Sequence, residues 1–300
     1  MLAVASPGPP VVETELRVNP ELHPLPFFYD LYTFRDRDGS TAIVAAFAVQ
    51  AGELHPEEGM RGPRYRFDVT LVLADTALRS VRRADDSVFV DLPRPLAGDH
   101  LLSTHVRVHA PPSRSTVHRV IMTDATTPGI GQLYSGSFPI PDYSGTELML
   151  SDIVLGLPEA EPGWRRGEVA LALLPTRLFP MSAFDVFYEV YNLPSGNRYA
   201  TEIFVEPIDE TGALQVGNRT PVRLRFAGES GAGPDDSLQE LRHVETSLAR
   251  GHYRITVTIT DEETGATATR SRTFQVRGWT PGVTLVAALP RKGGPRAPGR

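Results

Sequence analysis

The segment 187–193, FYEVYNL, carries the residues best suited to recognise a ligand. Successive side chains of an extended strand point to opposite faces, so Phe187, Glu189 and Tyr191 share one face and Tyr188 and Asn192 share the other. Two aromatic rings beside a carboxylate could stack on a sugar ring or hold a peptide. The same face could instead pack against the other half of the chain, which is the commoner role of aromatic residues on strands and the one we favour. The speculative binding residues are therefore Phe187, Tyr188, Glu189, Tyr191 and Asn192.

Three histidines could come together in space. His105 and His109 are four residues apart on one strand face, and His118 could lie across a hairpin from them. Three imidazoles converging on one point can bind zinc. No His-x-His spacing supports such a site, and the chain has no cysteine to add a thiolate ligand. We therefore predict no metal site and interpret His118 as a core-facing residue that hydrogen-bonds to a backbone group.

Two acidic segments, 36–40 (DRDGS) and 261–263 (DEE), resemble loops that bind calcium through several oxygen ligands. Both lie at expected β-turns, where Asp and Gly are favoured for backbone reasons alone. Turn formation is the interpretation we favour, with structural calcium between the two halves as the alternative. No cofactor is predicted.

Motifs of catalytic sites are absent from the sequence. It contains no Gly-x-Ser-x-Gly, Ser-x-x-Lys or His-Glu-x-x-His pattern and no glycine-rich phosphate loop. Because a triad assembled from distant residues leaves no local motif, a hydrolase remains a third alternative. We predict a protein without catalytic residues.

The composition limits the classes of partner and compartment. A net charge of −6 gives no basis for nucleic-acid binding, and no apolar window reaches the ~18 residues that a membrane-spanning helix needs. The first ten residues lack the charged and apolar regions of a complete signal peptide. With 26 glycines and 27 prolines, the chain is expected to have many turns and few long helices.

Alternating apolar and polar residues predict β-strands through most of the chain. The clearest example is the hairpin 252–276, in which Tyr253, Ile255, Val257 and Ile259 alternate with polar residues. A similar hairpin lies at 116–140, and Tyr65 to Asp75 matches Tyr199 to Asp209 in order and spacing. Residues 237–241 are the one place where a helical turn is expected. The fold class predicted is all-β, with two tandem antiparallel β-sandwich units of the immunoglobulin-like or transthyretin-like kind.

The predicted domain organisation follows from these segments. An irregular N-terminal lead-in covers residues 1–20, followed by sandwich unit 1 at 21–143 and a connecting segment at 144–164. This connection contains LMLSDIVLGL (148–157), which is expected to form an edge strand or a plug between the units because so apolar a run would be costly to expose. Sandwich unit 2 covers 165–278, and a disordered basic tail covers 279–300.

The order of three motifs resembles the C-terminal β-sandwich region of bacterial proteins named for a GWxTD motif. The motifs are LSDIVLG (150–156), FYEVYNL (187–193) and GHYRITVTITD (251–261). The GWxTD domain itself is absent, and Gly278-Trp279-Thr280 lacks the aspartate. The resemblance covers roughly residues 25–278 and implies a bacterial envelope or interaction protein.

We therefore predict a non-catalytic binding or scaffolding protein that presents β-sandwich surfaces to a protein partner whose identity the sequence does not give. A carbohydrate-binding module with structural calcium, and hence a glycan ligand, is the alternative. The resemblance favours a periplasmic, envelope or secreted location, and a cytoplasmic one stays open. Exposed aromatic rings would favour the glycan; a buried Phe187–Tyr191 face would favour the scaffold.

Overall fold

The computed structural model describes residues 23–60, 62–76, 80–158, 163–178, 183–215, 219–231, 237–245, 248–277 and 286–287. Within these ranges the regular structure is β-strand, apart from the short 3-10 turns η1 (Arg37–Gly39), η2 (Ala51–Glu53) and η3 (Thr176–Leu178). The described part of the chain contains no helix long and apolar enough to cross a membrane. The all-β fold class predicted from the sequence is confirmed.

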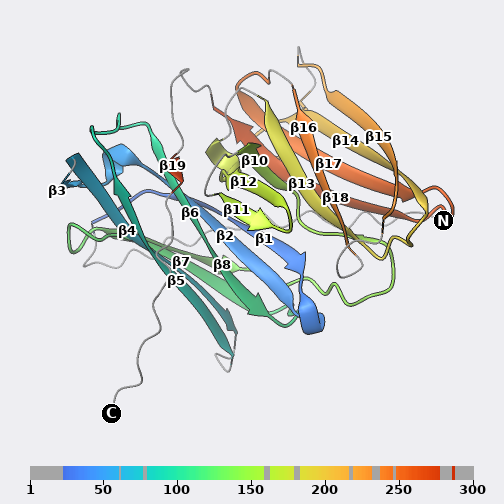
Figure 1. The fold of residues 1–300 in the computed structure, drawn as a ribbon, viewed down its shortest axis with the longest axis horizontal. Coiled ribbons are helices and arrows are strands. Elements are labelled where there is room, and N and C mark those ends of the chain that lie inside the picture. The colour runs from blue at the N-terminus through green and yellow to red at the C-terminus, as the bar shows by residue number, and fades with distance from the viewer. Residues whose placement is uncertain are drawn as a thin grey trace.

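The strands form two sandwiches that lie side by side (Figure 1). The first contains β1 (Phe28–Arg35), β2 (Thr41–Gln50), β3 (Glu57–Gly59), β4 (Gly62–Asp75), β5 (Val81–Asp91), β6 (Leu101–Ala110), β7 (Thr116–Asp124) and β8 (Gly131–Ser137). The second contains β9 (Met149–Leu150), β10 (Val154–Pro158), β11 (Trp164–Arg166), β12 (Val169–Leu173), β13 (Phe184–Tyr191), β14 (Arg198–Ile208), β15 (Val222–Glu229), β16 (Ser237–Val244), β17 (Gly251–Asp261) and β18 (Thr267–Val276).

Each sandwich has an inner sheet next to the other sandwich and an outer sheet away from it. The inner sheets have the strand orders β1-β2-β6 and β11-β12-β10-β13-β16, and β9 also pairs with β13. The outer sheets have the orders β5-β4-β7-β8 and β15-β14-β17-β18, and β3 also pairs with β4.

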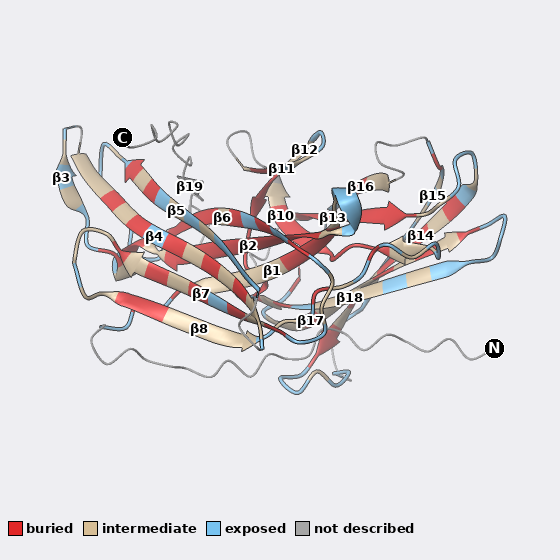
Figure 2. Ribbon diagram, turned by 90° about the horizontal axis from the view of Figure 1, so that it is seen from below, coloured by how far each residue is buried: buried red, intermediate tan, exposed pale blue. Residues whose placement is uncertain are grey.

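Three apolar cores hold these four sheets together. One core lies inside each sandwich, and a third joins the two inner sheets face to face through Tyr32, Phe34, Val44, Trp164 and Phe187. β13 is buried along its whole length and β2 at all but its last residue, because both faces of each strand are covered. Figure 2 shows the consequence: β2 and β13 are almost entirely buried, whereas the outer strands β4 and β17 alternate between buried and partly buried residues over most of their length.

The two sandwiches repeat the same seven-strand plan. The inner strands β1, β2 and β6 correspond to β10, β13 and β16, and the outer strands β5, β4, β7 and β8 correspond to β15, β14, β17 and β18. The register differs from the sequence alignment by two residues. Tyr199 pairs with Asp261, whereas the residue that pairs with the equivalent Asp124 is Phe67 and not Tyr65. A shift of two residues keeps every side chain on its face, so the period of two could not reveal it.

Three local expectations are corrected. Residues 237–241 belong to strand β16, which pairs with β13 along its whole length, and form no helical turn. β10, from the segment expected to form an edge strand or a plug, lies between β12 and β13. Within the tail expected to be disordered, β19 (Val286–Ala287) pairs in parallel with Leu102 and Ser103 of β6, at the edge of β6 opposite β2. The predicted lead-in 1–20 and the rest of the tail lie outside the described residues.

Candidate functional site

The predicted aromatic platform is buried. Phe187, Tyr188 and Tyr191 have no exposed surface, and Glu189 is 1% exposed. The Phe187 ring lies 5.4 Å from the Trp164 ring and 6.1 Å from the Phe34 ring of the first sandwich, measured between centroids. The hypothesis of an exposed stacking face is therefore wrong, because the first sandwich covers this face. The packing interpretation favoured for this face agrees with its burial.

Tyr188 lies on the other face of β13, inside the second sandwich. It belongs to the same core as Val190, Tyr199 and Ile203. Its hydroxyl donates to Thr201 Oγ1 at 3.5 Å, and burial raises its pKa to about 12. The neutral phenol is thus a core residue and does not line an open site.

Glu189 is the centre of a hydrogen-bonded group at the junction, the region where the two inner sheets meet. Arg166 donates to both carboxylate oxygens, from Nε at 2.7 Å and from Nη2 at 2.8 Å. Tyr191 donates its hydroxyl at 2.7 Å and Gln239 donates its amide at 2.9 Å. Arg166 Nη2 also donates to the Arg35 carbonyl at 2.7 Å. A buried carboxylate with four donors is fully satisfied, so Glu189 has no capacity left for a ligand. The bond from Arg166 to the Arg35 carbonyl joins this group to the first sandwich.

Asn192 directly follows β13 and is in the left-handed conformation, with φ 61°. Its side-chain amide donates to the carbonyls of Gly145 and Glu147, at 2.8 and 2.7 Å, and its oxygen accepts from Arg35 at 2.9 Å. Asn tolerates this backbone conformation better than most residues with a Cβ. Asn192 therefore ties the connecting segment and the first sandwich to the end of β13.

A second buried carboxylate belongs to Asp152, which was not among the site residues predicted from the sequence. Its Oδ2 accepts from the backbone N–H and the hydroxyl of Thr33, at 2.8 and 2.6 Å. Its Oδ1 accepts from Arg270 Nε at 2.9 Å and from a second nitrogen of the same guanidinium. Burial would raise the pKa of Asp152, but Arg270, Arg272 and the Thr33 hydroxyl together lower it below the usual value. Asp152 thus links the connecting segment, the first sandwich and β18 of the second.

The signal that could have located Asp152 is its position within an apolar run. In LSDIVLG the pair Ser151-Asp152 interrupts residues that must be buried, and a buried carboxylate requires a cation and hydrogen-bond donors. Arg270 and Arg272 were visible in the strand 267–276 as charges on its inward-facing side. Only the fold brings them to Asp152, 118 positions away from Arg270.

Arg272 completes the junction beside Asp152. It donates to the Leu31 carbonyl at 2.8 Å, lies 3.4 Å from Asp30 and stacks over the Tyr32 ring at 4.2 Å. All three of these partners belong to β1. The edge strand β18 therefore uses its inward-facing charges to hold the first sandwich.

The three candidate histidines do not converge. His118 is 1% exposed and its Nε2 lies 3.0 Å from the Tyr29 hydroxyl, while His109 contacts Asp36. Burial lowers the pKa of His118 and of His105 to about 4. No group of three or more His, Asp or Glu residues in the described ranges could hold a metal ion. The core-facing His118 is thus within hydrogen-bonding distance of a side chain, Tyr29, where a backbone partner was expected.

The carboxylate of Asp261 has partners in its own turn and in Asn197, and that of Asp36 contacts His109. Asp261 accepts from the Glu263 N–H at 3.0 Å and the Thr264 hydroxyl at 2.7 Å. Asp38 sits in a 3-10 turn at φ 59°. These are the roles that Asp has in turns.

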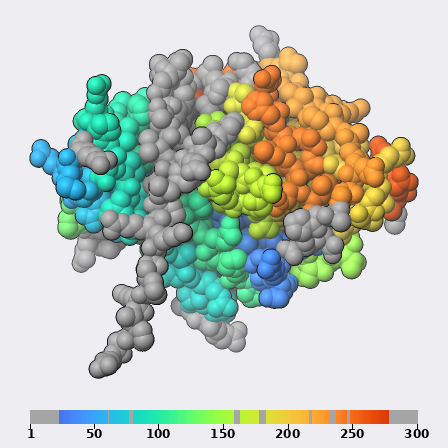
Figure 3. All heavy atoms as spheres, viewed as in Figure 1, coloured from blue at the N-terminus to red at the C-terminus, as the bar shows by residue number. Residues whose placement is uncertain are grey.

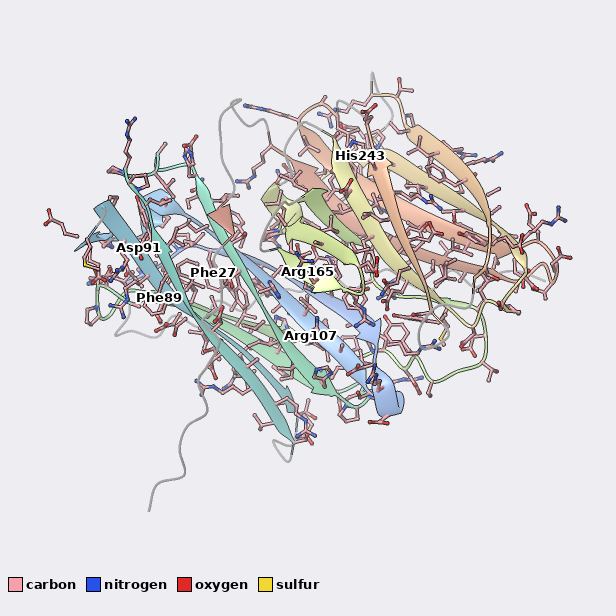
Figure 4. All side chains as sticks on the ribbon, in the orientation of Figure 1. Phe27, Phe89, Asp91, Arg107, Arg165 and His243 are labelled. Atoms are coloured by element: carbon pink, nitrogen blue, oxygen red, sulfur yellow. The ribbon has the colours of Figure 1, made fainter. Side chains whose placement is uncertain are left out.

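The solvent-exposed side of the junction carries arginines. Figure 4 shows Arg107 and Arg165 where the two sandwiches meet, and Arg107 Nη2 donates to the Arg165 carbonyl at 3.4 Å. Elsewhere, a shallow depression is lined by residues of the 36–40 turn, Arg82 and the end of β6. In the space-filling view the second sandwich lies directly against the first (Figure 3).

Comparisons with known proteins give no family. No protein-family model and no curated protein matches the chain. Among solved structures, red sea bream transglutaminase is similar at 11% identity, with a TM-score of 0.25 and coverage of 84% of this chain and 31% of that one. A Bacteroides uniformis β-glucuronidase is similar at 8% identity, with a TM-score of 0.25 and coverage of 78% and 26%. The chain thus spans less than a third of either protein, and the similarity carries no argument about function.

Proposed function

We propose that the protein is a non-catalytic binding or scaffolding protein, in which two β-sandwiches form one rigid body that presents its outer sheets, sheet edges and loops to a protein partner. The observation that carries this proposal is the junction. Its apolar core contains side chains of both inner sheets. Asp152 of the connecting segment accepts from Thr33 of β1, and Arg166, which binds Glu189, donates to the Arg35 carbonyl at the end of β1. A buried charge pair is weak evidence for stability, because desolvation offsets its attraction. We infer that these pairs fix the orientation of the two sandwiches, since their hydrogen bonds form in one geometry only.

The buried Phe187–Tyr191 face also favours the scaffold over the carbohydrate-binding alternative. A glycan needs exposed rings on which to stack, and these rings contact Phe34, Trp164 and Tyr143. Calcium needs free oxygen ligands, whereas the Asp261 carboxylate accepts from its own turn. The sequence resemblance supports a bacterial envelope setting for this scaffold.

A thermal-shift series tests the proposal. The purified chain would be heated with calcium, zinc, chelator, a glycan panel and fractionated envelope proteins. A ligand at 100 times its dissociation constant stabilises the folded state by about 2.7 kcal/mol, which raises the melting temperature measurably. We expect the shift from a protein fraction only, and the bound protein would then be identified by crosslinking. A shift with a glycan or metal, or turnover of an added substrate, would contradict the proposal.

A further inference from the structure

The edge strand β8 contains no charged residue. Its sequence is Gly131 to Ser137, GQLYSGS. Among the described edge strands of more than two residues, each of the others carries at least one Asp, Glu or Arg, including the inward-facing Arg270 and Arg272 of β18. Proteins protect free edges with charges, prolines or bulges, since a row of free N–H and C=O groups pairs readily with another strand. An unprotected edge is a site for strand addition.

The ladder shows which groups of β8 are free. Asp124 N–H donates to the Ile130 carbonyl and Phe138 N–H to the Thr116 carbonyl, so the even-numbered residues between them bond to β7. Leu133, Ser135 and Ser137 therefore direct their backbone N–H and C=O groups away from β7. Gln132 Nε2 reaches one of these, the Leu133 carbonyl, at the long distance of 3.4 Å. In the described part of the chain, no other strand pairs with this stretch.

Both ends of the free stretch are blocked. At one end, the Gly131 N–H donates to the His23 carbonyl at 2.9 Å. At the other end, Pro139 has no N–H to offer. A partner strand thus has three outward-facing residues available, Leu133, Ser135 and Ser137.

We propose that β8 pairs antiparallel with β8 of a second copy of this chain, with the two-fold axis at Ser135. In this register Leu133 faces Ser137 of the second copy and Ser135 faces its own equivalent, so all three free residues form hydrogen-bonded pairs. Registers centred on Leu133 or Ser137 would engage Gly131 or Pro139 and lose bonds. The two outer sheets become one continuous sheet of eight main strands, and no like charges oppose each other across the new pair.

The inward-facing residues of β8 are also self-complementary. In this register Tyr134 faces Gly136 of the second copy on both sides of the axis. An aromatic ring that covers a cross-strand glycine is a known stabilising arrangement of sheets. Tyr134 is half-buried and stacks on Tyr29, with ring centroids 5.7 Å apart, so the ring is already held in place at the edge. The edge thus complements itself, and this pairing goes beyond the proposed function because it requires no foreign partner.

Ser135→Lys is the first test, with Ser271→Lys as its matched control. Ser271 occupies the equivalent position on β18, because Ser135 pairs with Arg119 and Ser271 with Thr256, the same place in each hairpin. Sedimentation equilibrium of the full chain, up to about 0.5 mM, gives the dissociation constant. We expect the wild type and S271K to associate to twice 32.8 kDa, and S135K to weaken association about tenfold or more through opposed charges.

A second test does not depend on the stability of a lysine variant. The chain has no cysteine, so Ser135→Cys introduces a single thiol. Hydrogen-bonded partners lie about 5.5 Å apart between Cα atoms, within disulfide range. Mild oxidation should give a covalent dimer of S135C and little of the matched S271C. A monomeric wild type throughout the concentration range, equal effects of S135K and S271K, or equal crosslinking of the two cysteine variants would overturn the proposal.

Discussion

The two sandwiches repeat one plan of strands but differ in one edge strand of the outer sheet, which is β8 in the first sandwich and β18 in the second. At β8 the inward-facing side chain of Tyr134 packs against Phe27 and Tyr29 of the same sandwich. At β18 the equivalent residue is Arg270, which reaches out to Asp152. An aromatic edge completes its own sandwich, whereas an arginine edge is satisfied only by a neighbour. Because of this difference, β18 contacts the junction through its arginine side chains, whereas β8 remains an uncharged edge.

The comparison extends to the middle of each hairpin. His118 of β7 and Ile255 of β17 occupy equivalent positions and both face the core. The histidine contacts Tyr29, so the first sandwich has a polar contact where the second is purely apolar. The stability of the first sandwich is therefore expected to fall in mild acid, and that of the second to fall when its ion pairs are removed.

The largest expected effect comes from Asp152→Ala, which breaks the edge contact of the second sandwich. It leaves the mostly buried Arg270 guanidinium without its carboxylate, which should cost about 3–5 kcal/mol in the free energy of unfolding. Urea denaturation measures this cost. Asp68→Ala, at an exposed position of β4, should change it by less than ~0.5 kcal/mol. A loss below ~1 kcal/mol for D152A would show that the contact does not stabilise the junction. Adding Arg270→Met to D152A removes the unpaired charge and should recover part of the lost free energy of unfolding.

The pH dependence of the unfolding free energy gives a further test of the Asp152 contact. The pKa of Asp152 is lower in the folded than in the unfolded state. Its stabilisation is therefore fully present above the unfolded value of about 3.9 and is lost as the pH falls through the folded value. Below about pH 4 the unfolding free energies of wild type and D152A should converge. Parallel curves down to pH 2 would contradict this.

A smaller effect is expected from His118→Ile, which gives the first sandwich the residue of the second. The pKa of His118 falls from its ordinary value of 6.5 to about 4 on folding, because burial disfavours the charged ring. The unfolded chain therefore binds more protons between these values, and wild-type stability declines as the pH falls through that window. The variant should remove up to about 3 kcal/mol of this decline, measured by denaturation at pH 7 and pH 4.5. His105 should keep a residual slope, and His23→Gln, at an exposed position, serves as the control. An unchanged slope in H118I would refute the assignment.

The smallest effect is expected at Asn192, which holds the end of β13 against the connecting segment. Asn192→Ala loses the bonds to the Gly145 and Glu147 carbonyls and places a Cβ without side-chain compensation at φ 61°, which should cost about 1–2 kcal/mol. Asn192→Gly loses the same bonds but relieves the backbone, so it should cost about 1 kcal/mol less. Thermal denaturation compares the two. Equal losses would mean that the backbone conformation contributes little.

Period-two patterns were enough to predict the strands of both hairpins and the repeat of the sandwich, because half-buried strands show their faces directly in sequence. The same period leaves a shift of two residues undetected, as the Tyr65–Tyr199 alignment shows. It also could not reveal β16, where inward Glu240 and Arg242 interrupt the apolar pattern and suggest a helical turn instead. Fully buried strands such as β13 show no alternation at all, so their aromatic residues could be interpreted as either a ligand platform or a core.

The sequence by itself determined the all-β class, the tandem plan and the face on which each hairpin residue lies, since these depend on neighbours a few positions away. Only the tertiary structure decided that FYEVYNL is covered, that Asp152 meets Arg270 and that β8 keeps a free edge. Each of these depends on which sheet face meets which across more than a hundred residues of chain. Local periodicity predicts which residues lie on each face of a strand. Packing between elements far apart in the sequence decides what each face contacts.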